Sequence, residues 1–319
     1  MSITITGGIS LSGGGWTVAA PPSSYPTQKA IFGYGYSTTQ LSITNLVSST
    51  GVVATDTAGV GTARYLLSAA GYGTDKAIFG YGNPGSGTTS VTNLVSNTGV
   101  VGNDVAGVGT SRFYASAAGY GGDKAIFGYG SDGIAGAISL TNLVSNTGVV
   151  GNNVTGVGTA RYGIAAAGYG TDKAIFGYGK SSILTAITNL VSNTGVVAND
   201  VTGVGTARYV LAAAGYGTDK AIFGYGYNDG TSTSYSMTNL VSNTGVVATD
   251  TTGVGTARSF LAAAGYGGDK AIFGYGTPDA GGTYTATTNL VSNTGVVATN
   301  TTGVGTARYY LAAAGYSLT

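Results

Sequence analysis

Short apolar runs separated by glycine-rich turns recur along almost the whole chain. From Arg64, the run RYLLSAA (64–70) precedes the turn GYGTD (71–75), and the alternating run KAIFGYG (76–82) follows. A polar loop then leads to VTNLVS (91–96), the turn NTG (97–99) and an apolar pair at 100–101. Runs of this length bounded by Gly, Asn, Asp and Ser are typical of β-strands. The pattern therefore predicts four short antiparallel strands in each such stretch.

The stretch is repeated six times. KAIFGYG begins at Lys29, Lys76, Lys124, Lys173, Lys220 and Lys270, so the period is 47 to 50 residues. A period of this length with several strands per copy is typical of a β-propeller, one blade per repeat. The expected fold class is therefore all-β, a six-bladed β-propeller of four-stranded antiparallel blades.

The repeats are out of phase with the ends of the chain. KAIFGYG comes first at residue 29, whereas the last Arg-led run, 308–316, has no KAIFGYG after it. We therefore expect residues 308–316 to complete the first blade as its innermost strand, beside residues 29–53, and to close the ring. This divides the chain into a propeller over residues 29–319 and an N-terminal extension over residues 1–28. The extension is either a strand or tail on the propeller rim or a docking arm for another protein.

Composition limits the chemistry. The chain has no Cys, no His and no Glu, so all 12 acidic residues are Asp. The commonest general base and metal ligand is missing, and we expect no metal, no cofactor and no catalytic residue. With 8% charged residues and a net charge of +1, the chain has no basic surface for nucleic acid. No stretch reads as a signal peptide or a membrane span, so no membrane insertion is expected.

The glycine-rich strings FGYG allow two interpretations. They loosely resemble phosphate-binding loops, but no lysine-bearing helix follows them and they lie inside predicted strands. Glycine within a strand instead allows another backbone to approach closely. We favour the second interpretation.

Each copy resembles a kelch repeat: an Arg, a run of small apolar residues, a polar turn, then an aromatic strand ending in glycines. The resemblance covers residues 29–316, but the kelch Trp is missing and the chain's only Trp is Trp16. The strings LVSNTGVV and AAAGYG are also similar to repetitive propeller proteins of tailed bacteriophage particles. That resemblance implies a structural or adhesive role in a virion, a virion or extracellular location, and contacts to other virion proteins through residues 1–28.

Comparison of the six copies separates constant from variable segments. The loop between the second and third strands changes in length and content, from YSTTQLSI (36–43) to YNDGTSTSYSM (227–237), and the residues just after each Arg change as well. In an up-and-down blade both segments emerge on one face. This variation reflects either drift in exposed loops or a binding face rich in Tyr, Ser, Gly and Asn.

Two sets of residues are candidates for ligand or partner binding. The first is a predicted ring of arginines near the channel mouth, which either holds an anionic group or bonds loop carbonyls of the next blade: Arg64, Arg112, Arg161, Arg208, Arg258 and Arg308. The second is a set of tyrosines in the variable segments: Tyr36, Tyr114, Tyr227, Tyr235 and Tyr284.

An enzyme is the least favoured function. Sialidases share the six-bladed propeller, but the Glu that would activate a Tyr is absent here, and paired catalytic carboxylates are missing. The leading hypothesis is a non-enzymatic structural or adhesive propeller of a phage particle, with a cell-surface glycan or protein as a possible ligand. The alternative is a free-standing glycan-binding lectin.

Overall fold

The computed structural model describes residues 9–12, 15–18, 28–279 and 282–317. These residues form β-strands and turns without a helix, so the all-β prediction is confirmed. In the part of the chain that the structure describes, no helix has the length and apolar character needed to cross a membrane.

Six three-stranded antiparallel sheets make up most of the molecule. The first, second and third strands of each sheet are, in that order, β22 (Ala312–Tyr316), β3 (Lys29–Tyr36) and β4 (Gln40–Val47); β5 (Ser68–Tyr72), β6 (Lys76–Gly80) and β7 (Thr92–Val95); β8 (Ser116–Tyr120), β9 (Lys124–Gly128) and β10 (Thr141–Val144); β11 (Ala165–Tyr169), β12 (Lys173–Gly177) and β13 (Thr188–Val191); β14 (Ala212–Tyr216), β15 (Lys220–Gly224) and β18 (Thr238–Val241); β19 (Ala262–Tyr266), β20 (Lys270–Gly274) and β21 (Thr288–Val291). Two short hairpins complete the strands: β1 (Ile9–Ser12) with β2 (Gly15–Val18), and β16 (Tyr227–Asn228) with β17 (Thr233–Ser234).

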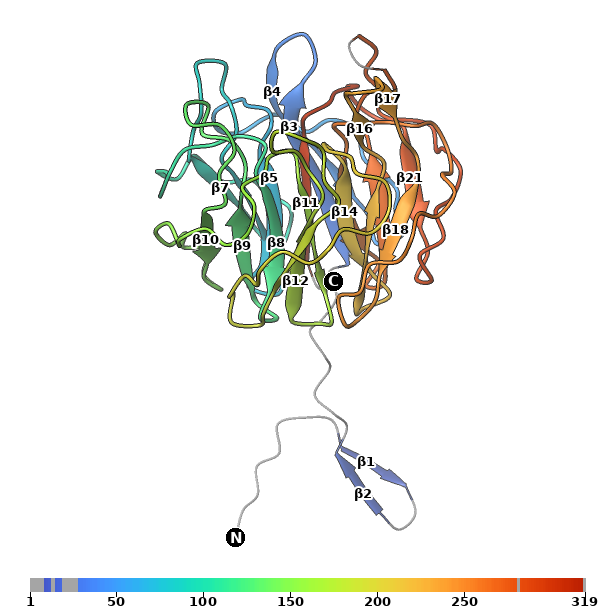
Figure 1. Cartoon of the computed structure of the whole chain (residues 1–319). Helices are drawn as coiled ribbons and strands as arrows, with labels where there is room; N and C mark the ends of the chain where they lie inside the picture. The colour runs from blue at the N-terminus through green and yellow to red at the C-terminus, as the bar shows by residue number, and fades with distance from the viewer. Residues whose placement is uncertain (1–8, 13–14, 19–27, 280–281, 318–319) are drawn as a thin grey trace.

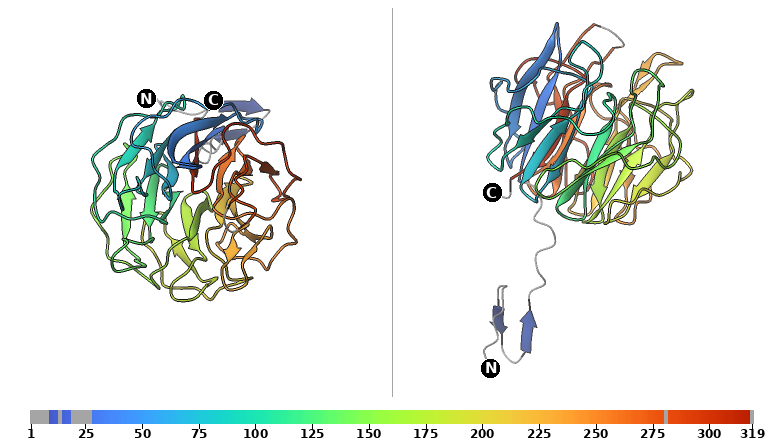
Figure 2. Two further views of the ribbon diagram at one scale, coloured as in Figure 1. Left: turned by 90° about the horizontal axis from the view of Figure 1, so that it is seen from above. Right: turned by 90° about the vertical axis from the view of Figure 1, so that its left-hand side faces the viewer.

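Seen from above, the sheets follow one another round a circle in chain order (Figure 2). At the end of the molecule where the turns between first and second strands lie, each sheet donates one main-chain N–H to the next sheet. The donors and acceptors are Gly73 to Asp123, Gly121 to Asp172, Gly170 to Asp219, Gly217 to Asp269, Gly267 to Gln28 and Ser317 to Asp75. This series returns to its starting sheet. We call this end, at the bottom of Figure 1, the turn face.

The last strand of the chain pairs with the first strand after residue 28. β22 runs antiparallel to β3 in a register from Ala312 opposite Gly33 to Tyr316 opposite Lys29. The predicted pairing of residues 308–316 with the first KAIFGYG segment is therefore confirmed. Of the predicted N-terminal extension, the structure describes the β1–β2 hairpin and Gln28, and the role of the extension stays a prediction.

Two details of the predicted sheets are wrong. The first strand of the second copy spans Ser68–Tyr72 rather than 64–70. Leu66 interrupts the run, because its φ of 58° is left-handed and incompatible with a strand. A fourth strand is also missing from the sheets. After β7 only the isolated bridges Val95↔Val101 and Thr92↔Val105 form, and the Asn93 side chain bonds the Gly102 carbonyl in place of a continuous ladder.

Sheets pack face to face through aromatic rings. Tyr34 meets Phe79 of the next sheet edge to face, with ring centres 5.1 Å apart, and both side chains are fully buried. Gly33 allows this approach, because a Cβ there would lie 2.6 Å from Phe79 Cζ. The first glycine of FGYG is thus a packing position within a strand, as the sequence interpretation favoured. Its close neighbour is a side chain rather than the backbone that the sequence suggested.

Candidate functional site

The opposite end of the molecule, at the top of Figure 1, carries the loops between second and third strands, and we call it the loop face. The residue after each Arg pairs there with the first residue of the loop in its own sheet. The bridges are Tyr36↔Tyr309, Tyr65↔Asn83, Phe113↔Ser131, Tyr162↔Lys180, Tyr209↔Tyr227 and Ser259↔Thr277. The two variable segments of the sequence therefore lie side by side, as predicted.

A ring of main-chain hydrogen bonds lies just inside these bridges. The second residue after each Arg donates its N–H to the carbonyl of its equivalent in the preceding sheet. The donors and acceptors are Leu66 to Tyr310, Tyr114 to Leu66, Gly163 to Tyr114, Val210 to Gly163, Phe260 to Val210 and Tyr310 to Phe260. All six residues have left-handed φ angles between 48° and 61°. The same conformation that interrupts the strand thus links the six sheets around one axis.

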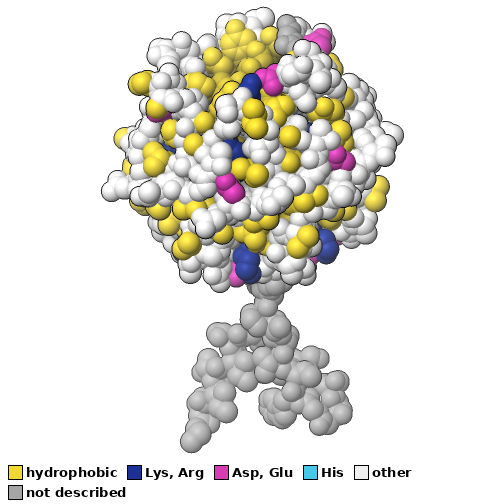
Figure 3. Space-filling model, viewed as in Figure 1, with side chains coloured by type: hydrophobic (Ala, Val, Ile, Leu, Met, Phe, Trp, Pro, Cys, Tyr) yellow, Lys and Arg dark blue, Asp and Glu magenta, His cyan; other side chains and the backbone are white. Residues whose placement is uncertain are grey.

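Aromatic side chains of the variable segments gather over this ring. We call this cluster the aromatic platform, and its members are Tyr36, Tyr65, Phe113, Tyr114, Tyr162, Tyr209, Tyr227, Phe260, Tyr284, Tyr309 and Tyr310. All except Tyr227 are partly exposed. Hydrophobic side chains are correspondingly prominent near the top of the molecule (Figure 3).

Five rings of the platform form a closed cycle of contacts. Their centres are 5.9 Å apart from Tyr310 to Tyr114, 5.7 Å to Tyr162, 6.3 Å to Tyr209, 6.5 Å to Phe260 and 4.4 Å back to Tyr310. These spacings are those of favourable edge-to-face and tilted aromatic pairs. Each ring of the cycle therefore packs against two others.

An arc of four further tyrosines extends the platform to one side. Tyr65 joins the cycle at Tyr310, with a centre separation of 5.7 Å, and Tyr36 lies 5.4 Å from Tyr65. Tyr309 follows Tyr36 at 5.8 Å, and Tyr284 stacks on Tyr309 at 4.6 Å with an interplanar angle of 12°. Tyr309 also lies 4.0 Å from Tyr310 and 5.9 Å from Phe260, so these tyrosines close back on the cycle and widen the platform on one side only.

The phenols of Tyr209 and Tyr114 stay protonated well above neutral pH. Burial raises the pKa of Tyr209 to about 12, with a further contribution from the nearby Asp229 carboxylate. Burial also raises the pKa of Tyr114, and the neighbouring Tyr310 hydroxyl adds to the effect. These hydroxyls are consequently neutral donors at physiological pH.

The predicted tyrosines have different environments. Tyr36, Tyr114 and Tyr284 belong to the platform and are partly exposed. Tyr227 is only 8% exposed and packs against Tyr209 at a centre separation of 6.0 Å, so it adds little exposed surface to the platform, and its binding role stays a prediction. Tyr235 is partly exposed but makes no ring contact with the platform in the described residues; its main chain bonds Gly226 and Arg258.

The arginines do not line the channel mouth. All six side chains are 0% exposed and lie between neighbouring sheets. Arg64 places its guanidinium carbon 4.4 Å from the Tyr34 ring centre of the preceding sheet. It donates from Nε to the Tyr81 carbonyl at 2.9 Å and from Nη2 to Asn93 Oδ1 at 2.7 Å, both in its own sheet. The structural alternative for these residues is thus supported, although the bonded carbonyls are not those of the next blade.

Each buried arginine is linked to a polar network at the rim. Asn93 donates from Nδ2 to Asp104 Oδ1 at 2.9 Å, and Asp104 in turn accepts from the N–H and the hydroxyl of Thr62. Two copies have Asn in place of this Asp: Asn153 belongs to the network of Arg112, and Asn300 belongs to that of Arg258. In these copies Arg112 Nε, Arg258 Nε and Arg258 Nη1 have no hydrogen-bond partner among the described residues.

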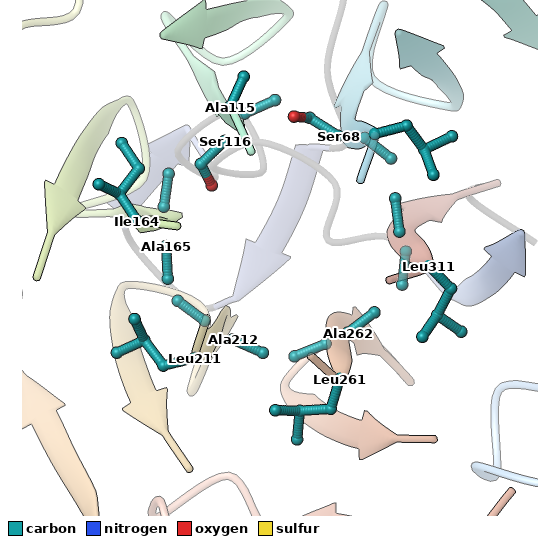
Figure 4. A pocket seen from close by; sticks show the side chains of 18 of the residues that line it. Ser68, Ala115, Ser116, Ile164, Ala165, Leu211, Ala212, Leu261, Ala262 and Leu311 are labelled. Carbon is teal, nitrogen blue, oxygen red and sulfur yellow. The ribbon is translucent and has the colours of Figure 1, made fainter. Parts of the chain in front are cut away.

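Beneath the platform an axial cavity of about 200 Å³ runs between the first strands of the sheets. Alanine, leucine and isoleucine side chains surround it, and Ser68 and Ser116 are the serines in its wall (Figure 4). A second hollow of about 260 Å³ lies at the turn-face end, lined by tyrosines, lysines and glycines of the turns. Five lysines of these turns each bond the preceding Asp, at 2.5 to 3.0 Å.

No group of three or more His, Cys, Asp or Glu side chains that could hold a metal ion occurs among the described residues. The chain matches no protein-family model, and no curated protein is significantly similar to it.

Most residues of the platform were not among the predicted binding residues. Tyr65, Tyr162, Tyr209, Phe260, Tyr309 and Tyr310 occur in the variable patch after each Arg. The aromatic residue directly after the Arg in five of the six copies, Tyr65, Phe113, Tyr162, Tyr209 and Tyr309, was a usable signal. Their convergence was not, because it depends on the left-handed residues that turn these segments toward the axis.

Proposed function

We propose that the chain is a six-bladed β-propeller, with one blade per three-stranded sheet, and that its loop face is a non-enzymatic binding surface. The two series of main-chain hydrogen bonds, one at each face, support the closed ring. The pairing of β22 with β3 supports closure by the C-terminal strand, which removes two free sheet edges.

The aromatic platform is the observation that carries the binding function. Partly exposed tyrosines offer large contact areas, a hydroxyl and little side-chain entropy to lose, and such residues dominate binding energies at interfaces. Contiguous apolar surface is uncommon on a monomeric protein unless it binds something. Contacts between the rings of the cycle and the arc lower the cost of ordering these rings on binding.

The sequence resemblance alone supports a proposal for the particle to which the protein belongs. We propose a phage particle, in which residues 1–28 contact other virion proteins and the loop face meets a cell-surface glycan or protein. Gln28, the last residue of the extension, bonds Ser317 and Gly267 and so lies on the turn face, the side away from the platform. This arrangement suits an anchor at one end and a receptor site at the other.

Attachment of the labelled protein to a panel of bacterial cells tests the binding function. The double substitution Tyr65→Ala and Tyr162→Ala should reduce attachment at least about tenfold, because each ring contributes on the order of 1 kcal/mol or more. Lys173→Ala with Lys220→Ala on the turn face is the matched control and should leave attachment unchanged. Equal losses from both pairs, or no attachment by the unaltered protein to any cell, would refute the proposal.

A further inference from the structure

The charged side chains described on the loop face are ion-paired or hydrogen-bonded within the protein. Lys180 and Asp229 form an ion pair between neighbouring sheets, next to Tyr209. The Asp132 carboxylate accepts three main-chain N–H groups of its own loop, from Ile134, Ala135 and Gly136, at 2.8 to 3.2 Å. In the same way Asp279 accepts from the N–H groups of residues 282 and 283. The described residues of this face therefore provide no unpaired cation for an acidic ligand.

Four tyrosine hydroxyls of the platform differ from those of the core tyrosines in their hydrogen bonding. Each fully buried tyrosine of the FGYG strings donates to a main-chain carbonyl, as Tyr34 does to Val60 at 3.1 Å. By contrast, the hydroxyls of Tyr36, Tyr65, Tyr162 and Tyr209 form no hydrogen bond with the described residues of the protein. These rings are partly exposed, so their hydroxyls can bond a ligand.

The platform offers a ligand several neighbouring tyrosine rings on one side of the central cycle. The arc from Tyr284 through Tyr309 and Tyr36 to Tyr65 continues into the central cycle at Tyr310. Successive rings are 4.6 to 5.8 Å apart along this path. A ligand of linked rings with apolar faces and polar edges can contact several of these adjacent tyrosines at once.

We infer that the platform binds a neutral oligosaccharide, a polyhydroxylated chain without carboxylate, sulfate or phosphate groups. The C–H faces of the sugar rings pack on the tyrosine rings, and the sugar hydroxyls bond the free phenols. Acidic sugars are disfavoured because the face offers no unpaired cation to balance their charge. This inference rests on the proposed binding function of the loop face and assigns its ligand class.

Immobilised oligosaccharides test the ligand class directly. The probes are neutral oligosaccharides, oligosaccharides of the same length containing uronic acids, and random peptides. We expect binding to one or more neutral probes, unchanged between 50 and 500 mM NaCl, since no charge is involved. Binding confined to acidic probes or to peptides, binding that weakens with salt, or binding to none of the probes would overturn the inference.

Conservative variants separate ring packing from hydroxyl bonding. Tyr65→Phe keeps the ring and should weaken binding to a neutral probe about three- to tenfold, as expected for loss of one hydrogen bond. Tyr65→Ala should weaken it further, and Lys173→Ala should not change it. An unchanged affinity of Tyr65→Phe would overturn the predicted role of the hydroxyls.

The cell-attachment assay distinguishes failure of this inference from failure of the proposed function. Cells whose glycans have been oxidised with periodate should lose attachment, whereas protease-treated cells should keep it. The reverse result, combined with loss of attachment in Tyr65→Ala, would leave the loop face as a binding surface for a protein. Attachment that does not depend on Tyr65 and Tyr162 would remove the binding function itself.

Discussion

Arg161 Nη1 lies 3.6 Å from Asp200 Oδ1, so a fully buried cation has a carboxylate beside it at the rim of the sheet. The equivalent carboxylate is absent beside Arg112, where Asn153 takes its place. Asn153→Asp should therefore stabilise the protein, because it supplies a counter-charge to a desolvated guanidinium. We expect roughly 0.5 to 1 kcal/mol, since the carboxylate is partly exposed, and a similar gain for Asn300→Asp.

Denaturant unfolding at pH 7 measures this gain. Asn152→Asp is the matched control, because Asn152 is the exposed neighbour of Asn153 and lies outside the network. Conversely, Asp200→Asn should lose about as much stability as Asn153→Asp gains. No difference between Asn153→Asp and Asn152→Asp would contradict the role of the carboxylate.

Acid should weaken the rim networks. Burial alone would raise the pKa of Asp56, but bonds from Thr306 and Asn45 and the charge of Arg308 outweigh it and hold the pKa below its ordinary value. Asp104, Asp200 and Asp250 are shifted in the same direction by equivalent partners. A lowered pKa in the folded state gives a stability contribution that is complete above the unfolded value near 4 and lost as the pH falls through the folded value.

Unfolding measured from pH 7 to pH 3 checks this expectation. The free energy of unfolding should be nearly constant above about pH 5 and fall below about pH 4. A variant with all four of these aspartates changed to Asn should be less stable at pH 7 and show a flatter acid dependence. A slope identical to that of the unaltered protein would show that other groups cause the acid sensitivity.

Removal of the C-terminal strand should destroy cooperative folding. Deletion of residues 308–319 eliminates β22, the ladder partner of β3, and also Arg308. It removes Tyr310 as well, one of the six residues in the ring of main-chain hydrogen bonds on the loop face, which we call the loop-face ring. The exposed edge of β3 would then be free to pair with other chains. We expect aggregation or loss of the main thermal transition, whereas deletion of residues 318–319 alone should change neither. A shortened chain that melts like the full one would refute closure by β22.

Alanine at the FGYG glycine should separate neighbouring sheets. In Gly177→Ala the new Cβ would lie 2.7 Å from Phe223 Cζ of the next sheet, and that ring is fully buried and cannot move aside freely. Overpacking of this kind costs about 1 to 3 kcal/mol. Gly282→Ala is the control, because none of the described residues lies within 4 Å of its Cβ position. Equal thermal stability of the two variants would contradict the packing role of Gly177.

The sequence period and its phase were sufficient to predict the all-β class, the six copies and the pairing of residues 308–316 with residues 29–35. The local sequence pattern gave a wrong prediction where a side chain makes a hydrogen bond that the main chain makes in a regular sheet. The outer strand was predicted from Val100 and Val101, but Asn93 bonds the carbonyl that a ladder would have used. The arginines were misplaced because a charged residue at the start of an apolar run is ordinarily exposed, whereas here Tyr and Asn partners make burial possible.

The loop-face ring links the sheets through main-chain atoms only, so it makes no demand on the side chains of its members beyond tolerance of a left-handed turn. Leu, Tyr, Gly, Val and Phe all occupy equivalent positions in it. The part of the molecule that joins the copies and the part that we propose binds a ligand therefore share residues without sharing chemical groups. Exchange of aromatic and aliphatic residues at these six positions would alter the proposed binding surface while it leaves the main-chain links between the sheets in place.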